Sequence, residues 1–181
     1  RYGIDCEFQQ NGYVMGALTP GAVAKLEAKA QQYNAVGAKT RVLDKQATEE
    51  MTGSPRYHGG WFHSEAGHLN PLGYARGLAR AVLQEGGTVH TGSPVRDVVW
   101  QDGAWAVQAG EGTVVADKVI FATGAYTVDG WPGLDQTYKI QRVFVAATQP
   151  LTASERQTIL PRNTTMHDGR GDIFVYKYNA E

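Results

Sequence analysis

Cysteine is nearly absent from this sequence: Cys6 is the single one among 181 residues. One cysteine excludes an internal disulfide framework and most cysteine-based zinc sites. Charge of one sign is also lacking, because 17 lysines and arginines balance 18 aspartates and glutamates to a formal net charge of -1. That balance gives no electrostatic case for binding nucleic acid or an anionic membrane.

Long apolar runs are missing too. No run approaches the roughly 18 residues that a transmembrane helix needs, and no signal peptide is visible. The five histidines show no metal-binding spacing such as H-E-x-x-H, so we predict no metal site. We expect a cytoplasmic protein that has no membrane or nucleic-acid partner. Since the sequence opens at Arg1 and stops just after a strand-like run, we also expect it to be a piece of a longer protein.

Glycine, in contrast, is abundant. The 22 glycines predict many turns and close backbone approaches. Three segments carry helix-start signals: Thr19 before Pro20, Asp44 before Gln46, and Asn70 before Pro71. The first helix is expected to end near Gly37, the second near Met51 and the third near Glu85. The third has an apolar face on a 3.6-residue period, which predicts its burial; that face comprises Leu72, Ala75, Leu78, Ala79, Val82 and Leu83.

Strand signals fill most of the remaining chain. A short helix over 152–159 is also expected. The Asp102-Gly103 pair predicts a two-residue hairpin. The apolar run Lys118–Thr123 predicts a strand buried on both faces. The predicted strands are 12–18, 40–43, 57–63, 88–90, 95–100, 104–109, 113–116, 118–123, 142–148, 164–166 and 172–178.

Several motifs in this order resemble one enzyme family. They are Gly67-His68-Leu69-Asn70-Pro71, the helix segment 74–79, the stretch 116–120 and Ala122-Thr123-Gly124-Ala125. Together they resemble the FAD-dependent amine and D-amino-acid oxidase family, in particular its bacterial γ-glutamylputrescine oxidoreductase-like branch. The segments 57–60 and 168–172, with Tyr176, are similar to the substrate lobe of that branch.

The resemblance implies an α+β fold: the α/β middle of an FAD-binding domain plus a substrate lobe with a mixed or antiparallel sheet. Residues 67–125 would be the cofactor-domain part. Residues 1–66 and 126–181 would be the two parts of the substrate lobe. The βαβ unit of the family, with its G-x-G-x-x-G phosphate loop at a helix N-terminus, is not in this sequence. We therefore expect a fragment of a bipartite FAD-binding fold that neither binds FAD tightly nor is active alone.

The resemblance also implies a reaction and site residues. The longer protein would take a hydride from a C–N bond of a small amine or amino acid, give an imine, and reduce FAD. The backbone of Val95 would lie against the adenine ring, and Thr123 and Gly124 would lie near the ADP moiety. The alternatives from the residues alone are a core valine and an ordinary turn.

Substrate-side candidates are His68, Tyr176 and Tyr178. His68 either transfers a proton or satisfies a loop carbonyl. Tyr176 and Tyr178, two residues apart, should share one face of a strand and line a cavity, or else belong to a half-buried sheet. Arg170 either pairs with a carboxylate of the substrate or, because it lies in a turn, is solvated, and we expect the second.

Two other function classes stay open. One is a non-catalytic binding module that kept the fold without the cofactor. The other is a flavin subunit of a multi-subunit dehydrogenase. The sequence upstream of Arg1 discriminates the enzyme from the binding module. A strand followed by G-x-G-x-x-G and a later acidic residue would support the enzyme, and the absence of that unit would favour the binding module.

Overall fold

A computed structural model describes residues 1–127, 131–170 and 174–179. The chain divides into two compact units, Arg1–Glu85 with Thr148–Glu181, and Gly86–Ala147. We call them the first unit and the second unit. The first contains a mixed sheet with helices, and the second an antiparallel sheet, so the predicted α+β class is confirmed.

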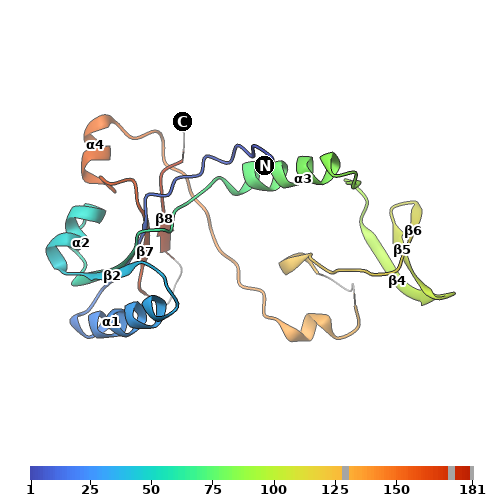
Figure 1. The fold of residues 1–181 in the computed structure, drawn as a ribbon, viewed down its shortest axis with the longest axis horizontal. Coiled ribbons are helices and arrows are strands. Elements are labelled where there is room, and N and C mark those ends of the chain that lie inside the picture. The colour runs from blue at the N-terminus through green and yellow to red at the C-terminus, as the bar shows by residue number, and fades with distance from the viewer. Residues whose placement is uncertain (128–130, 171–173, 180–181) are drawn as a thin grey trace. The chain divides into compact units, whose positions relative to one another are not determined.

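The first unit is built on a five-stranded sheet in the order β2-β3-β1-β7-β8 (Figure 1). Strands β1 and β7 run parallel, and the other neighbours pair antiparallel. The sheet therefore joins strands that are far apart in the sequence. Its strands are β1 (Tyr13–Ala17), β2 (Thr40–Leu43), β3 (Gly59–His63), β7 (Thr165–Asp168) and β8 (Phe174–Tyr176).

Four helices belong to the same unit: α1 (Pro20–Ala35), α2 (Lys45–Thr52), α3 (Pro71–Gln84) and α4 (Ala153–Thr158). Each begins after a side-chain cap. The Thr19 hydroxyl accepts from the Ala22 amide, and the Asp44 carboxylate accepts from the Ala47 amide at 2.7 Å. The Asn70 side chain accepts two amides of the first turn of α3, each at 3.1 Å. The predicted helix starts are confirmed, because a cap satisfies backbone donors that the helix itself cannot.

The core of the first unit consists of two hydrophobic clusters. One contains Val14, Tyr57, Leu160 and Met166, and the other contains Ala17, Leu26, Ala30 and Trp61. Leu26 and Ala30 are the buried residues of α1 and hold the helix against the sheet.

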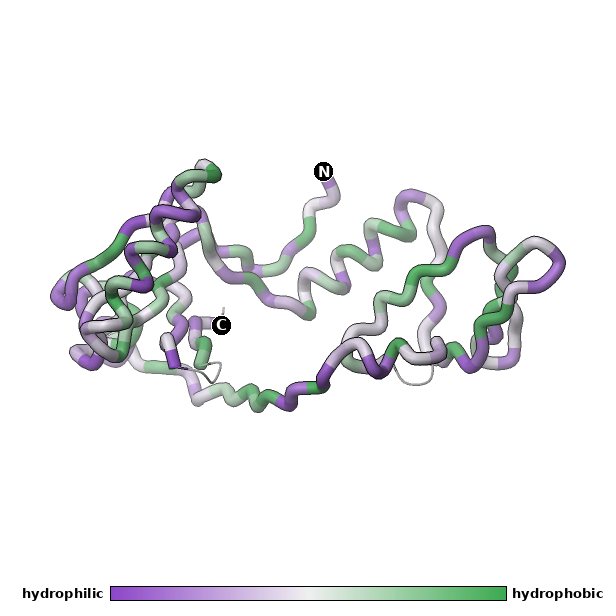
Figure 2. Tube along the Cα trace, turned by 90° about the horizontal axis from the view of Figure 1, so that it is seen from below, coloured by the Kyte–Doolittle hydropathy of each residue, from purple (hydrophilic) through white to green (hydrophobic). Residues whose placement is uncertain are grey.

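Helix α3 departs from its prediction. The residues of its expected buried face are exposed or, in the case of Ala79, half-buried, and Figure 2 shows hydrophobic positions recurring along the helix. The helix instead buries Gly77 and Ala81. A Cβ placed on Gly77 would lie 2.2 Å from Cγ2 of Ile4, so a glycine lets the N-terminal segment approach closely. The amphipathic pattern predicted the helix correctly. The prediction of its buried side was wrong, because the small residues Gly77 and Ala81 are the ones that are buried.

The second unit is a three-stranded antiparallel meander of β4 (Val95–Gln101), β5 (Ala104–Ala109) and β6 (Gly112–Ala116). This confirms the predicted strands. Asp102 and Gly103 form the hairpin with positive φ angles of 52° and 81°, as a type I′ turn requires. Two short 3-10 helices follow at Gly124–Tyr126 and Leu134–Thr137.

Three predicted strands are wrong. Residues 88–90, 118–123 and 142–148 form no strand, and Ile120 and Phe144 are 87% and 99% exposed. A strand needs a neighbour for its backbone hydrogen bonds, and no described segment pairs with these runs. The start of the strand predicted over 172–178 lies outside the described residues. Its described part contains β8, Phe174–Tyr176.

The two units also follow boundaries other than the predicted lobes. Helix α3 belongs to the first unit because the N-terminal segment covers its small-residue side, and residues 126–147 belong to the second unit. The extent of the cofactor domain over 67–125 stays a prediction. Within the described ranges, no helix is both long and apolar enough to cross a membrane.

Candidate functional site

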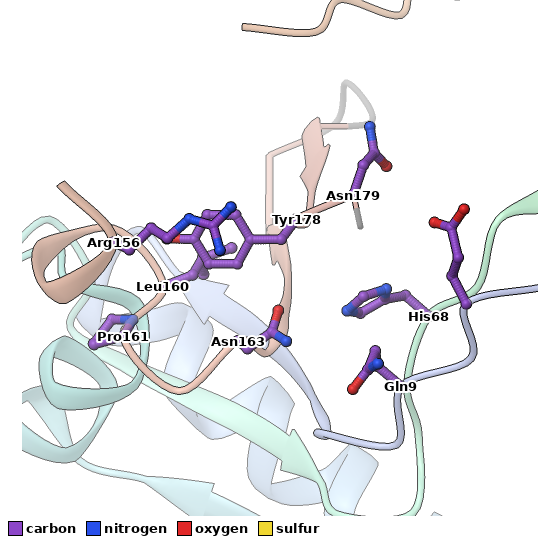
Figure 3. Close-up of a pocket in the computed structure, with 9 residues that line it drawn as sticks. Gln9, His68, Arg156, Leu160, Pro161, Asn163, Tyr178 and Asn179 are labelled. Atoms are coloured by element: carbon purple, nitrogen blue, oxygen red, sulfur yellow. The ribbon is translucent and has the colours of Figure 1, made fainter. Parts of the chain in front are cut away.

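A cavity of about 400 Å³ lies in the first unit, and we call it the His68 cavity (Figure 3). Two of the predicted substrate residues, His68 and Tyr178, line it together. The structure adds polar and charged neighbours that sequence reasoning missed. The main ones are Glu7, Gln9, Arg156 and Asn163.

Backbone pairing places His68 at the cavity. The Gln9 amide donates to the His68 carbonyl and the His68 amide donates to the Gln9 carbonyl, both at 2.9 Å. A Cβ on Gly67 would lie 2.0 Å from the Gln9 carbonyl oxygen. The glycine before His68 is therefore what allows this close pairing.

The imidazole of His68 has unusual surroundings. Both ring nitrogens are buried, and neither has a hydrogen-bond partner among the described residues. Burial lowers the pKa of His68, the nearby Lys177 charge lowers it further, and Asn163 opposes both. Asn163 is thus close enough to influence the ring, without standing in hydrogen-bond geometry to it. A neutral imidazole has one donor and one acceptor nitrogen, so it could serve either end of a polar ligand.

Tyr178 forms the opposite wall. Its hydroxyl donates to the carbonyl of Ile159, and the Arg156 guanidinium lies 5.3 Å from the ring centroid. Burial raises the pKa of the Tyr178 phenol, so it stays a neutral donor. Strand β8 ends at Tyr176, and the expectation that Tyr176 and Tyr178 share one strand is therefore wrong.

Tyr176 belongs to a second group around Asp168. Asp168 is 2% exposed and accepts two side-chain hydrogen bonds from Arg170, at 2.9 and 2.5 Å. The Tyr57 hydroxyl lies 3.4 Å from the Asp168 carboxylate and 3.5 Å from the Tyr176 hydroxyl. The hydrogen bonds from Arg170 lower the pKa of Asp168, and burial, followed by Tyr57, raises the pKa of Tyr176. Arg170 is held by this ion pair, so its predicted solvation is wrong.

The cofactor-side candidates lie in the second unit. Val95 opens β4 and is 54% exposed. The Thr123 hydroxyl contacts that of Thr127, and Gly124 begins a 3-10 turn with a φ of 54°. No hydrogen bond or strand pairing of the described residues joins Val95 to Thr123 or Gly124. The role of these three residues stays a prediction.

These residues fit an FAD site only in part. No atom lies within 4 Å of a Cβ built on Gly124, so another group could approach this backbone closely. The sequence has no G-x-G-x-x-G loop, and so the amides that hold a dinucleotide pyrophosphate are not provided by it. Within the described ranges, no group of three or more His, Cys, Asp or Glu side chains could hold a metal ion.

The mixed sheet of the first unit and the antiparallel meander of the second match part of the fold of a glycine oxidase. The glycine oxidase from Geobacillus kaustophilus superimposes with a TM-score of 0.71 at 19% identity, over 97% of this chain and 46% of that one. The L-proline dehydrogenase from P. horikoshii gives a TM-score of 0.62 at 17% identity, over 69% of this chain and 34% of that one.

Sequence comparison shows the family. The model of the DAO family, described as FAD dependent oxidoreductase, matches residues 1–179, and the chain belongs to this family. It is 30% identical to the probable oxidoreductase OrdL of Haemophilus influenzae, and 29% identical to the gamma-glutamylputrescine oxidoreductase of Escherichia coli K12. All of this chain is covered in both comparisons, but only 43% and 42% of the relatives. The chain thus spans less than half the length of these curated relatives.

Proposed function

We propose that the protein containing this chain is an FAD-dependent oxidoreductase that oxidises a C–N bond of an amine or amino acid to an imine. The observation that carries the proposal is the family match across residues 1–179. The names of the relatives support the substrate class, because they include a gamma-glutamylputrescine oxidoreductase and a glycine oxidase. FAD supplies the hydride acceptor when bound.

In this proposal the His68 cavity contributes to the substrate side. It combines a buried imidazole with the aromatic wall of Tyr178, and ligand sites typically combine apolar walls with a few placed polar groups. Val95, Thr123 and Gly124 are proposed to contact the ADP part of the cofactor. The chain of 181 residues, without a phosphate loop, is proposed to hold FAD too weakly to retain it.

The test uses the full-length protein and this chain side by side. Purified full-length protein should show a flavin absorbance band that bleaches anaerobically on adding one amine or amino acid from a broad panel. The chain alone should be colourless. A full-length protein that holds no flavin, or whose flavin no amine or amino acid reduces, would refute the proposed function. A flavin band near one equivalent in the chain alone would refute the proposed dependence on a phosphate loop.

A further inference from the structure

A buried carboxylate of the first unit accepts hydrogen bonds on both of its oxygens. Asp168 ends β7 and is 2% exposed. Its Oδ1 accepts from the Arg170 backbone amide at 3.0 Å and from Arg170 Nε at 2.9 Å, and its Oδ2 accepts from Arg170 Nη2 at 2.5 Å. The Tyr57 hydroxyl lies 3.4 Å from the same Oδ2. The hydrogen bonds from Arg170 lower the pKa of Asp168, so the carboxylate is ionised at neutral pH and can only accept.

A glycine lets the Tyr57 ring reach this carboxylate. Gly16 of β1 pairs with Asp168 of β7, and a Cβ built on Gly16 would lie 2.4 Å from Cδ1 of Tyr57. The ring therefore lies directly against the β1 backbone, where it is buried in the same cluster as Met166. Met166 is paired with Tyr176 of β8 and lies two residues before Asp168, so all three side chains leave the sheet on one face. The fold thus gathers two phenols and one carboxylate on that face.

The Tyr57 hydroxyl connects the buried carboxylate to a more exposed phenol. Its oxygen lies 3.5 Å from the Tyr176 hydroxyl oxygen, and Tyr176 is 37% exposed. A hydroxyl has one proton, so Tyr57 donates either to Asp168 or to Tyr176. A hydrogen bond to an ionised acceptor is roughly twice as strong as one between neutral groups. If Tyr57 turned its proton towards Tyr176, its lone pairs would also face the buried negative charge. The Tyr57 proton therefore lies on the side of Asp168.

We propose that Tyr176 offers a hydrogen-bond acceptor, and not a donor, to the group that binds against it. The Tyr57 oxygen, whose own proton points to Asp168, accepts the only proton of Tyr176. We call this chain of two hydrogen bonds the tyrosine relay. Only lone pairs of Tyr176 remain for a ligand, so this position takes an N–H or O–H donor and disfavours a carboxylate. Tyr57 and Asp168 are positioning residues that fix this polarity. That the donor belongs to the substrate rests on the proposed function, and the direction of the relay does not.

Raman difference spectra of the full-length protein without ligand test the direction of the relay. The two-band Raman signal of a tyrosine ring changes its intensity ratio according to whether the phenol donates or accepts. The parent spectrum minus that of Tyr176→Phe isolates Tyr176, and we expect the ratio of a donating phenol. In a Tyr57→Phe background the same subtraction should give the ratio of a phenol in water, and in a Tyr74→Phe background, an exposed tyrosine of α3, the parent ratio. An accepting phenol in the parent, or a ratio that Tyr57→Phe leaves unchanged, would overturn the proposal.

Asp168→Asn should reverse the relay. The oxygen of the new side chain should stay with the two Arg170 donors that Oδ1 now accepts, so its amide nitrogen takes the place of Oδ2. That nitrogen donates to Tyr57, Tyr57 donates to Tyr176, and the Raman signal of Tyr176 changes to that of an accepting phenol. Asp97→Asn, exposed on β4, is the matched control and should keep the parent signal. A Tyr176 signal that Asp168→Asn leaves unchanged contradicts the relay, and Tyr57→Phe tests it without altering the ion pair.

A double-mutant cycle separates positioning from a merely structural role of Tyr57. The probe is the compound of the amine and amino-acid panel that reduces the flavin of the full-length protein fastest. Tyr57→Phe should weaken its apparent Kd for flavin reduction about fivefold, the value of one neutral hydrogen bond. In a Tyr176→Phe background the same change should weaken it less than about twofold, because no relay remains to break. Equal weakening in both backgrounds would show that Tyr57 does not act through Tyr176.

Failure of this inference and failure of the proposed function are distinguishable. Flavin that an amine reduces, in a protein whose Tyr176 gives the Raman signal of an accepting phenol, would sink the inference alone. A donating Tyr176 that Tyr57→Phe releases, in a protein whose flavin no amine or amino acid reduces, would sink the proposed function alone.

Discussion

The two units differ in whether their apolar residues are buried. Every buried residue of the described chain lies in the first unit, and none lies in the second. Yet the second unit is not polar. It holds exposed large hydrophobic residues, among them Val99, Trp100, Val115, Ile120 and Phe144. An apolar sequence pattern thus becomes a core only where a second layer covers it.

The sheets show the physical reason. The five-stranded sheet has helices whose side chains reach it, as Leu26 and Ala30 of α1 do at Trp61. The three-stranded sheet has only short segments against it, where Trp105, Phe121 and Trp131 stack edge to face at 5.7 and 6.1 Å. Two packed layers are the minimum that stabilises a domain, so we expect the second unit to be the weaker one.

The largest difference between the units should appear on truncating hydrophobic side chains. Met166, fully buried in the first unit, should cost about 2–5 kcal/mol when changed to Ala, because a cavity remains. Val115, 70% exposed in the second unit, should cost no more than about 0.5 kcal/mol as Val115→Ala. Urea unfolding followed by circular dichroism measures both. Equal losses for the two variants would contradict the distinction between the units.

A smaller difference should follow from removing a charge. Asp168→Asn removes the carboxylate charge that pairs with Arg170, and we expect a loss of about 2 kcal/mol, below the 3–5 kcal/mol typical of breaking a fully buried pair because Arg170 is one-third exposed. Asp97→Asn in the second unit, exposed on β4, is the control and should be nearly neutral. Thermal unfolding compares the two variants. An Asp168→Asn variant as stable as the parent would show that the ion pair does not stabilise the first unit.

The ion pair also predicts a dependence on acid. The pKa of Asp168 is lowered in the folded chain, chiefly by the hydrogen bonds from Arg170. Its stabilisation should be fully present above the ordinary value of 3.8 and be lost as the pH falls below it. Asp168→Asn should remove this part of the acid transition. Identical acid transitions in the parent and the variant would count against it.

The smallest effect concerns His68. Because its pKa is lowered below the ordinary value of 6.5, the folded state binds fewer protons than the unfolded state just below that pH. The stability of the first unit should therefore be full above pH 6.5 and fall as the pH drops through the lowered pKa. His68→Gln should abolish this change. Unfolding at a series of pH values measures it, and a His68→Gln profile that keeps the fall would exclude His68 as its cause.

Sequence reasoning succeeded where neighbouring residues decide the structure. The caps at Thr19, Asp44 and Asn70 and the Asp102-Gly103 hairpin act within a few residues, and all of them formed as predicted. Sequence reasoning failed where the structure of a segment depends on a partner far away in the sequence. The run 118–123 is apolar enough for a buried strand, but none of the described segments pairs with it.

The candidate site shows the same division. His68 and Tyr178 were proposed separately, and only the tertiary fold places them on one cavity. Nothing in the local sequence marks Glu7, whose left-handed conformation depends on its surroundings. The residue type of Asn163 weakly indicated its left-handed conformation, because asparagine tolerates positive φ better than most residues.

Hydrogen exchange measured along this chain tests the central claim most directly, that the first unit has its own core and the second does not. The amides of β1 and β3 should exchange slowly, near the rate set by global unfolding, because both strands lie inside a covered sheet. The amides of β4 and β5, although paired, should exchange at least about a hundredfold faster through local opening. Equal protection in the two sheets would contradict the claim.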